Sequence, residues 1–260
     1  MLKEESLSGF ARLREIVARL RGPDGCPWDR KQTHASLKPY LIEECYEFLQ
    51  ALEEGSPQKL CEEMGDLLLQ IMLHAQIAAE AGQFEIEDVV RGISDKLIHR
   101  HPHVFGGDKV KGAAEVEVNW EALKQEERQE GDSLLSSVPK QMPALAYSQS
   151  IQRRVTRVGF DWERVEEIID KVAEEVLEIK QARGEQEMAK EFGDLLFTIA
   201  NVARRLNIDL ETALRSANQR FCQRFSHMEE VCRKRGIGFA RLSFQEQNAL
   251  WEEAKRQVEG

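Results

Sequence analysis

The sequence predicts an all-α protein built as two tandem, related helical bundles, and three observations lead to this. Aromatic residues make up only 7% of the chain and charged residues 32%, a balance that suits a helical protein better than a β-rich one. Apolar residues recur at helical spacing through most of the 260 residues. One pattern of acidic residues is written twice, once in each half, which indicates a duplicated unit.

The first expected helix covers residues 1–21, where charged and apolar residues alternate in a helical rhythm. The turn-forming sequence Gly22-Pro23-Asp24-Gly25 ends it. A second helix is expected to begin near Ser36 or Pro39, because its apolar residues return to one face at helical spacing. It stops at Gly55, which is followed by serine and proline.

Three further helices are expected in the first half. The helix over 58–80 has little polar surface after Leu60, so we expect it to be central and largely buried. Another follows over 85–99, and residues 101–107 are expected to form a loop. A short helix over 120–130 then closes the half.

Residues 131–143 are rich in Gly, Ser and Pro and predict a linker between a domain over 1–130 and a domain over 144–260. The second half repeats the plan of the first. Its expected helices cover 145–158, 166–183, 187–206, 210–234 and 244–258. A Trp-Glu-x-x-Lys sequence begins at Trp120 and again at Trp251, equally far from the acidic pattern of its own half.

The repeated acidic pattern is Glu-Glu-x-x-Glu followed by Glu-x-x-Asp. The acids are Glu43, Glu44, Glu47, Glu63 and Asp66 in the first half, and Glu174, Glu175, Glu178, Glu191 and Asp194 in the second. Residues three and four apart share a helix face, so two such helices side by side offer four or five carboxylates to one cation. No Lys or Arg stands four residues after any of them, and we expect the acids to repel one another unless a cation binds.

A single such pattern would most simply be a solvated helix face, but its repetition favours a site. Oxygen ligands favour Mg²⁺, with Mn²⁺ as a substitute, over zinc or copper. A di-iron site would need Glu-x-x-His pairs, and none occurs in the sequence.

Charge and cysteine content restrict the partners and the compartment. The formal net charge of −10 comes without a basic tract, which argues against nucleic acid as a partner. No segment is long and apolar enough for a membrane span or a signal peptide. The five cysteines are scattered and form no C-x-x-C pair, so the cytoplasm is the expected location.

Longer strings of sequence flank the acidic pattern and make it specific. They are the string from Cys26 to Leu37, the string from Lys96 to Phe105, Gly159-Phe160-Asp161-Trp162, and the string from Asn218 to Phe225. Together they closely resemble the MazG family of nucleoside triphosphate pyrophosphohydrolases, over nearly the whole chain and in its two-domain form. The resemblance implies the fold of the all-α NTP pyrophosphohydrolase superfamily.

The resemblance also implies a reaction. It is the Mg²⁺-dependent hydrolysis of NTPs and dNTPs to a nucleoside monophosphate and pyrophosphate, carried out by a homodimer. The residues that match the family's metal ligands are Glu175, Glu178, Glu191 and Asp194 in the second domain, and Glu44, Glu47, Glu63 and Asp66 in the first. The matching nucleotide contacts are Lys171, Arg220, Arg224 and Trp251, with Lys190 expected as a further contact in place of a family Lys that this sequence lacks. Glu174, beside Glu175, is the expected general base for a metal-bound water.

Two positions depart from the family pattern. Arg220 stands where the family more usually has Lys, and Glu187 stands where a Lys is expected, so that Lys190 is the nearest substitute. Both changes affect the phosphate contacts, since Arg and Lys bond phosphate differently. The resemblance implies that the second domain is the active one, although the first has lost none of its carboxylates.

Two alternatives to a general pyrophosphohydrolase stay open. The chain could be a helical regulator that binds a nucleotide or a partner protein without catalysis. It could also be a single-substrate relative, such as a dCTP or phosphoribosyl-ATP pyrophosphohydrolase. Base and sugar preference cannot be read from the sequence.

Overall fold

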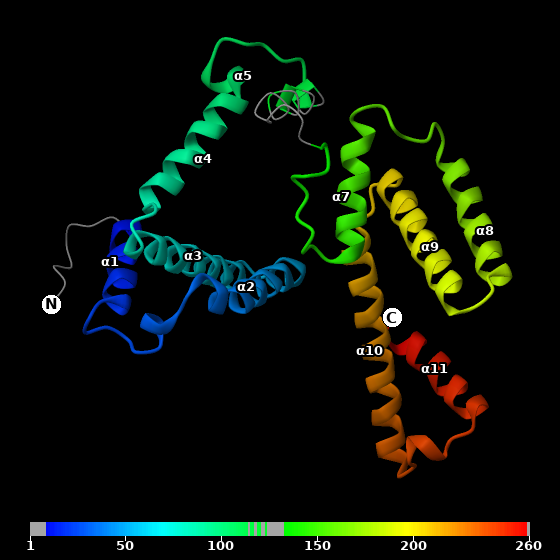
Figure 1. Ribbon diagram of the computed structural model, residues 1–260. Coiled ribbons are helices and arrows are strands. Elements are labelled where there is room, and N and C mark those ends of the chain that lie inside the picture. The colour runs from blue at the N-terminus through cyan, green and yellow to red at the C-terminus, as the bar shows by residue number, and fades with distance from the viewer. Residues whose placement is uncertain (1–8, 114, 117–118, 121–122, 124–132, 259–260) are drawn as a thin grey trace. The chain divides into compact units, whose positions relative to one another are not determined.

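The computed structural model describes residues 9–113, 115–116, 119–120, 123 and 133–258. Within these ranges every regular element is helical and none is a strand, which confirms the all-α prediction. The chain divides into two compact units, Met1–Arg128 and Gln129–Gly260 (Figure 1). None of the described helices has the length and apolar character that crossing a bilayer requires.

The first unit follows the predicted order of helices. Its elements are α1 (Gly9–Arg21), the 3-10 turn η1 (Asp29–Lys31), α2 (His34–Glu54), α3 (Pro57–Glu80), α4 (Ile86–Arg100) and α5 (Pro102–Phe105). Helix α2 begins earlier than predicted because Thr33 and Ser36 form a capping box across its first turn. The predicted loop over 101–107 is partly wrong, since α5 lies within it. Most of the predicted helix over 120–130 falls outside the described residues.

Helix α3 is central in the first unit, as predicted, and contacts α1, α2 and α4. Its C-terminal half supplies Met72 and Leu73 to a core that Val17, Leu37 and Ile86 complete from α1, α2 and α4. The expectation that α3 would be largely buried is wrong for its outer face. There Met64 and Ile71 stand 57% and 47% exposed.

The second unit also follows the predicted order of helices. Its elements are α7 (Ala144–Thr156), α8 (Val165–Gln181), α9 (Glu185–Arg205), α10 (Leu210–Arg235), the 3-10 turn η2 (Phe239–Arg241) and α11 (Phe244–Val258). Each of its five helices lies within two residues of its predicted bounds. Figure 1 shows α8 and α9 as one antiparallel hairpin and α10 and α11 as another.

Helix α7 is fixed to the rest of the second unit by a buried glutamine. Gln149 donates from Nε2 to the Ile208 carbonyl at 2.8 Å and accepts at Oε1 from the Leu210 backbone N–H at 3.0 Å. These bonds bridge α7 to the turn between α9 and α10, and the acids of the second unit project from the α8–α9 hairpin beside it.

Candidate metal and nucleotide site

The α8–α9 hairpin brings three of the predicted acids of the second unit together. One carboxylate oxygen from each of Glu175, Glu178 and Glu191 lies within 4.8 Å of the others. Asp194, predicted as a fourth ligand, is not in this group, and its carboxylate pairs with Lys190 at 3.4 Å. The group therefore joins two acids of α8 to one of α9.

Two lysines neutralise these acids. The Lys171 ammonium lies 2.9 Å from a carboxylate oxygen of Glu174 and 2.9 Å from one of Glu175. The Lys190 ammonium lies 2.9 Å from Glu191. Hydrogen bonds to Glu175 and Glu174 raise the pKa of Lys171, and bonds to Glu191 and Asp194 raise that of Lys190.

The expectation that the acids would lack balancing cations is thus wrong for the second unit. Lysines do stand four residues away, but they precede the acid: Lys171 comes four residues before Glu175, and Lys190 four residues before Asp194.

The residues of the second unit fit a hard divalent cation. The Glu175 side chain is only 5% exposed, and its Oε2 is buried with no hydrogen-bond partner among the described residues. Burial, with the charges of Glu175 and Glu191, raises the pKa of Glu178 although Lys171 opposes the shift. A divalent cation would supply the missing partner for Oε2 and relieve the repulsion, and the donor set is all oxygen.

The first unit assembles a similar group on α2 and α3. Carboxylate oxygens of Glu44, Glu63 and Asp66 lie within 4.8 Å of one another. Burial, then the charges of Asp66 and Glu47, raise the pKa of Glu44. Burial, then Glu47 and Asp66, raise the pKa of Glu63. Glu47 thus lies beside the group without being one of its three members, and burial together with repulsion between carboxylates disfavours the charged forms of Glu44 and Glu63.

The structure places the predicted aromatic contact on the α10–α11 hairpin. The Arg224 guanidinium carbon lies 5.5 Å from the ring centroid of Trp251, and the Phe221 ring lies 5.3 Å from it. Trp251 also packs on the core formed by α10 and α11. Arg220 is exposed on α10. The predicted contacts Arg220, Arg224 and Trp251 thus lie on α10 and α11, and not on the α8–α9 hairpin that carries the acids.

The cation–π contact occurs in both units. In the first unit the Arg100 guanidinium carbon lies 5.5 Å from the Trp120 ring centroid, as Arg224 does from Trp251 in the second. The recurrence extends the duplication inferred from sequence beyond the acids to an Arg–Trp pair.

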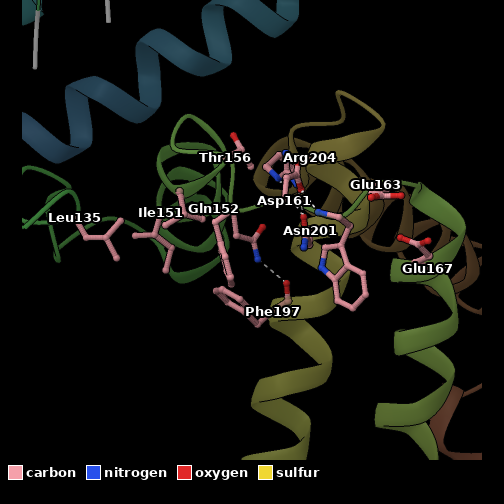
Figure 2. Close-up of a pocket in the computed structure, with 14 residues that line it drawn as sticks. Leu135, Ile151, Gln152, Thr156, Asp161, Glu163, Glu167, Phe197, Asn201 and Arg204 are labelled. Atoms are coloured by element: carbon pink, nitrogen blue, oxygen red, sulfur yellow. Dashed lines mark hydrogen bonds and ion pairs between the residues drawn. The ribbon is translucent and has the colours of Figure 1, made fainter. Parts of the chain in front are cut away.

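The second unit also has a cavity of about 610 Å³ between α7, the loop before α8, and α9 (Figure 2). Apolar and aromatic side chains form most of its wall. Gln152 lines it, 4% exposed, and donates to the Phe197 carbonyl at 2.8 Å. Burial acts to raise the pKa of Asp161, but hydrogen bonds from Arg204 and from the Trp162 N–H outweigh it, and the pKa lies below its usual range.

Two polar residues at these sites were not predicted from the sequence. Gln70 on α3 is 6% exposed and its side chain hydrogen-bonds Glu44, an interaction that acts to lower the pKa of that carboxyl. Gln152 is the second. The usable indication for Gln70 was its place four residues after Asp66, on the acidic face of α3. For Gln152 the sequence offered only one indication of burial, which was its place among apolar residues of an amphipathic helix.

Comparisons with known proteins agree with the duplicated plan. The family model described as the MazG nucleotide pyrophosphohydrolase domain matches the chain twice, over residues 32–105 and 162–229. The chain is 46% identical over 247 residues to the nucleoside triphosphate pyrophosphohydrolase/pyrophosphatase MazG of Thermotoga maritima, covering 95% of each. It is 41% identical over 254 residues to the nucleoside triphosphate pyrophosphohydrolase of Escherichia coli K12, covering 95% of this chain and 97% of that one.

In two other comparisons the match covers only part of one of the two chains. The chain is 47% identical over 261 residues to the uncharacterised protein YabN of Bacillus subtilis, of which it spans 53%. The crystal structure of a MazG-related protein from Thermotoga maritima superposes with a TM-score of 0.39 at 31% identity, over 44% of this chain and 98% of the other.

Proposed function

Because the chain belongs to the MazG nucleotide pyrophosphohydrolase family, we propose that it hydrolyses nucleoside triphosphates, both NTPs and dNTPs, to the monophosphate and pyrophosphate, with Mg²⁺ as cofactor and Mn²⁺ as a substitute. The observation that carries the proposal is the second acidic group. One carboxylate oxygen from each of its three glutamates lies within 4.8 Å of the others, and two lysines pair with the group. Glu175 Oε2 is buried and has no hydrogen-bond partner among the described residues.

Glu175, Glu178 and Glu191 would hold the cation, with Asp194 joining them once Lys190 moves away. Bound Mg²⁺ supplies charge neutralisation at the phosphate oxygens and lowers the pKa of a water molecule. The two lysines already sit on the carboxylates that the cation would neutralise. Substrate binding would therefore release both ammonium groups toward the phosphates.

The chain's own residues provide the remaining steps. Glu174 is 59% exposed and lies outside the group of three, so it is free to accept the proton of the attacking water when Lys171 turns away. Water attacks the α-phosphorus, the bond to the bridging oxygen breaks, and pyrophosphate leaves. Lys171 and Lys190 stabilise the charge that develops on the leaving group. Arg220, Arg224 and Trp251 are kept as proposed nucleotide contacts.

We also propose the homodimer and the cytoplasmic location expected from the sequence. Large apolar side chains stand half-exposed on the acid-bearing hairpin, among them Leu177, Phe192 and Leu196 at 52%, 50% and 50%. A surface of this kind is suited to cover by a second copy, which would give a symmetric, self-complementary interface.

Pyrophosphate release from separate NTPs and dNTPs tests the function. We expect turnover with Mg²⁺ or Mn²⁺ and none with EDTA. Release from one nucleotide alone would favour the single-substrate alternative. Nucleotide binding without release, with metal present, would favour the non-catalytic regulator and contradict the proposal.

A further inference from the structure

One carboxylate ties the loop before α8 to the end of α9. Asp161 accepts two bonds from the Arg204 guanidinium, at 2.5 and 3.2 Å, and one from Arg205 Nη1 at 3.2 Å. Its Oδ1 also accepts from the Trp162 backbone N–H at 2.9 Å. The Arg205 guanidinium donates a further bond to the Glu163 carbonyl at 3.0 Å. These contacts are called the Asp161 clamp below.

The clamp differs from an ordinary surface ion pair. The side chains of Arg204 and Asp161 are only 10% and 22% exposed. The Asn201 carboxamide oxygen also accepts from Arg204, at 2.6 Å from Nη2 and 3.1 Å from Nε (Figure 2). Partly buried, bidentate bonds between charged groups are stronger than exposed ion pairs. The clamp therefore holds the loop before α8 firmly in place.

Helix α8 has few other anchors. It packs mainly on α9. Of its 17 residues only Ile168 and Glu175 are buried, while Ile169 and Leu177 stand 50% and 52% exposed. One of the two buried residues is thus a carboxylate, and its burial beside other acids opposes closure of the hairpin when no cation is bound. The contacts at the ends of α8 must offset this opposition.

The acidic group lies between the two ends of the hairpin. The turn over 182–184 joins α8 to α9 at one end, and the Asp161 clamp closes the other. Glu175 stands ten residues after the start of α8, a rise of about 15 Å. Arg204 stands thirteen residues after Glu191 on α9, a rise of about 20 Å. Both helices are continuous over these stretches, so a change in their separation at the clamp is carried to the acids.

The first unit closes its acid-bearing hairpin at the same place with other residues. There Arg21 of α1 donates to the Asp29 and Gln32 carbonyls, in the segment before α2, at 2.5 and 3.2 Å. The same guanidinium bonds both carboxylate oxygens of Glu80, the last residue of α3, at 3.0 and 2.8 Å. Two unlike sets of side chains thus tie the segment before the first helix to the end of the second. This recurrence indicates that the tie serves the acidic hairpin.

We propose that Asp161 is a positioning residue for the second acidic group, because its clamp holds α8 against α9 with the three carboxylates within reach of one cation. The proposal rests on the proposed function, which makes this group a metal site. Asp161 acts through the helices and not on the metal or the nucleotide. It raises the fraction of chains whose hairpin is closed before the metal arrives. If the cation binds only the closed hairpin, its apparent dissociation constant rises as that fraction falls.

Asp161→Asn tests this, since it keeps the size of the side chain and removes its charge. Mn²⁺ binding without nucleotide is followed by electron paramagnetic resonance in a Glu44→Gln background, where the first group has lost a carboxylate. We expect the Mn²⁺ dissociation constant to rise about 3- to 10-fold, because the bonds that favour the closed hairpin are weakened. The Mg²⁺ concentration for half-maximal turnover should rise by a similar factor. At saturating Mg²⁺, kcat and the nucleotide KM should return to within about twofold of the wild type.

Two further variants make the test specific. Arg205→Gln leaves the Arg204 bonds in place and should raise the Mn²⁺ dissociation constant by only about twofold, which also serves if Asp161→Asn does not fold. Glu80→Gln is the matched control, because it breaks the corresponding tie of the first unit. It should lower Tm to a similar extent, yet leave the Mn²⁺ affinity of the second group and the Mg²⁺ dependence of turnover unchanged.

Wild-type Mn²⁺ affinity in Asp161→Asn would overturn the positioning role while leaving the proposed function intact. The same conclusion would follow from a loss of kcat that saturating Mg²⁺ does not restore, or from equal losses of affinity in Asp161→Asn and Glu80→Gln. If the wild-type chain releases no pyrophosphate, the proposed function fails, and the Mn²⁺ affinities still decide the role of Asp161. A wild-type second group that binds no Mn²⁺ would overturn both.

Discussion

The two units carry matching acids but group them differently, with Glu178 in the second group and Asp66 in the first, and the two groups have different neutralising partners. In the second unit Lys171 and Lys190 each contact two carboxylates. The matching positions of the first unit hold Tyr40 and Glu62. Its one nearby lysine, Lys59, stands four residues before Glu63 but pairs with Glu54 at 2.5 Å.

From this difference we propose that the first unit is a cation site only, whereas the lysines of the second unit also allow it to bind phosphate groups. Lysines that hold the acids in the absence of metal are the groups that a triphosphate can take over when metal arrives. In the first unit, burial and then neighbouring carboxylates raise the pKa of Glu44 and Glu63, and we propose that this group has affinity for a cation but little for the phosphates. Retained carboxylates therefore do not by themselves predict an active first unit.

The largest expected effect comes from removing one equivalent ligand in each unit. Glu175→Gln should lower kcat for pyrophosphate release by about 100-fold or more, because a metal ligand and its charge are lost where the transition state needs them. Glu44→Gln, the matched change in the first unit, should alter kcat by less than about twofold. The reverse result would move the active site to the first unit.

A smaller effect should follow from releasing the second group from its lysine. In a Glu44→Gln background, which silences the first group, Lys171→Met should raise affinity for Mn²⁺ about threefold in the absence of nucleotide, because the ammonium no longer competes for Glu174 and Glu175. The same variant should lower kcat/KM about tenfold through the lost phosphate contact. Free Mn²⁺ can be followed by electron paramagnetic resonance.

Lys234→Met is the control for this change. Lys234 also pairs with a glutamate four residues away, Glu230 at 2.8 Å, but on α10 and outside the acidic group. Its removal should change neither Mn²⁺ affinity nor kcat/KM. A Lys171→Met variant whose Mn²⁺ affinity is unchanged or falls would contradict the competition between lysine and cation.

Hydrophobic periodicity and helix-ending Gly or Pro residues sufficed to predict most of the helices, because both depend only on the local sequence. The predicted start of α2 near Ser36 or Pro39 is late, because the Thr33–Ser36 capping box starts the helix at His34 and Pro39 lies inside it. The four-residue helix at Pro102 was missed because so short an element carries no periodicity.

The candidate site was only partly accessible from the sequence. Helical spacing brought Glu175 and Glu178 together correctly, and the repeat pointed to Glu191 on the neighbouring helix. Spacing could not tell that Asp194 would turn to Lys190, since that depends on which rotamers the hairpin allows. The unpaired oxygen of Gln152 could not be predicted for a similar reason. Its burial and the bond from Gln152 to the Phe197 carbonyl depend on how α7 and α9 pack together.

The smallest expected effect is on the stability of the first unit without metal. The pKa of Glu44 is raised above its usual value, so ionising it costs the native state free energy at pH values above the folded pKa, and this cost disappears as the pH falls through it. In EDTA at pH 7, Glu44→Gln should therefore slow amide hydrogen exchange in α2 and α3 about two- to fivefold relative to the wild type. The difference should shrink toward pH 4 and be abolished by Mg²⁺.

Glu54→Gln, also on α2, should have the opposite effect on the stability of that helix. Hydrogen bonds from Lys59, then Gln50, lower the pKa of Glu54, so its contribution to stability is present above the unfolded pKa and is lost as the pH falls through the folded one. This variant should speed exchange in α2 slightly at pH 7, by less than about twofold, and Mg²⁺ should not alter the difference. If both variants changed exchange in the same direction, general effects of removing a charge from an acidic chain would explain the data, and repulsion within the first acidic group would not.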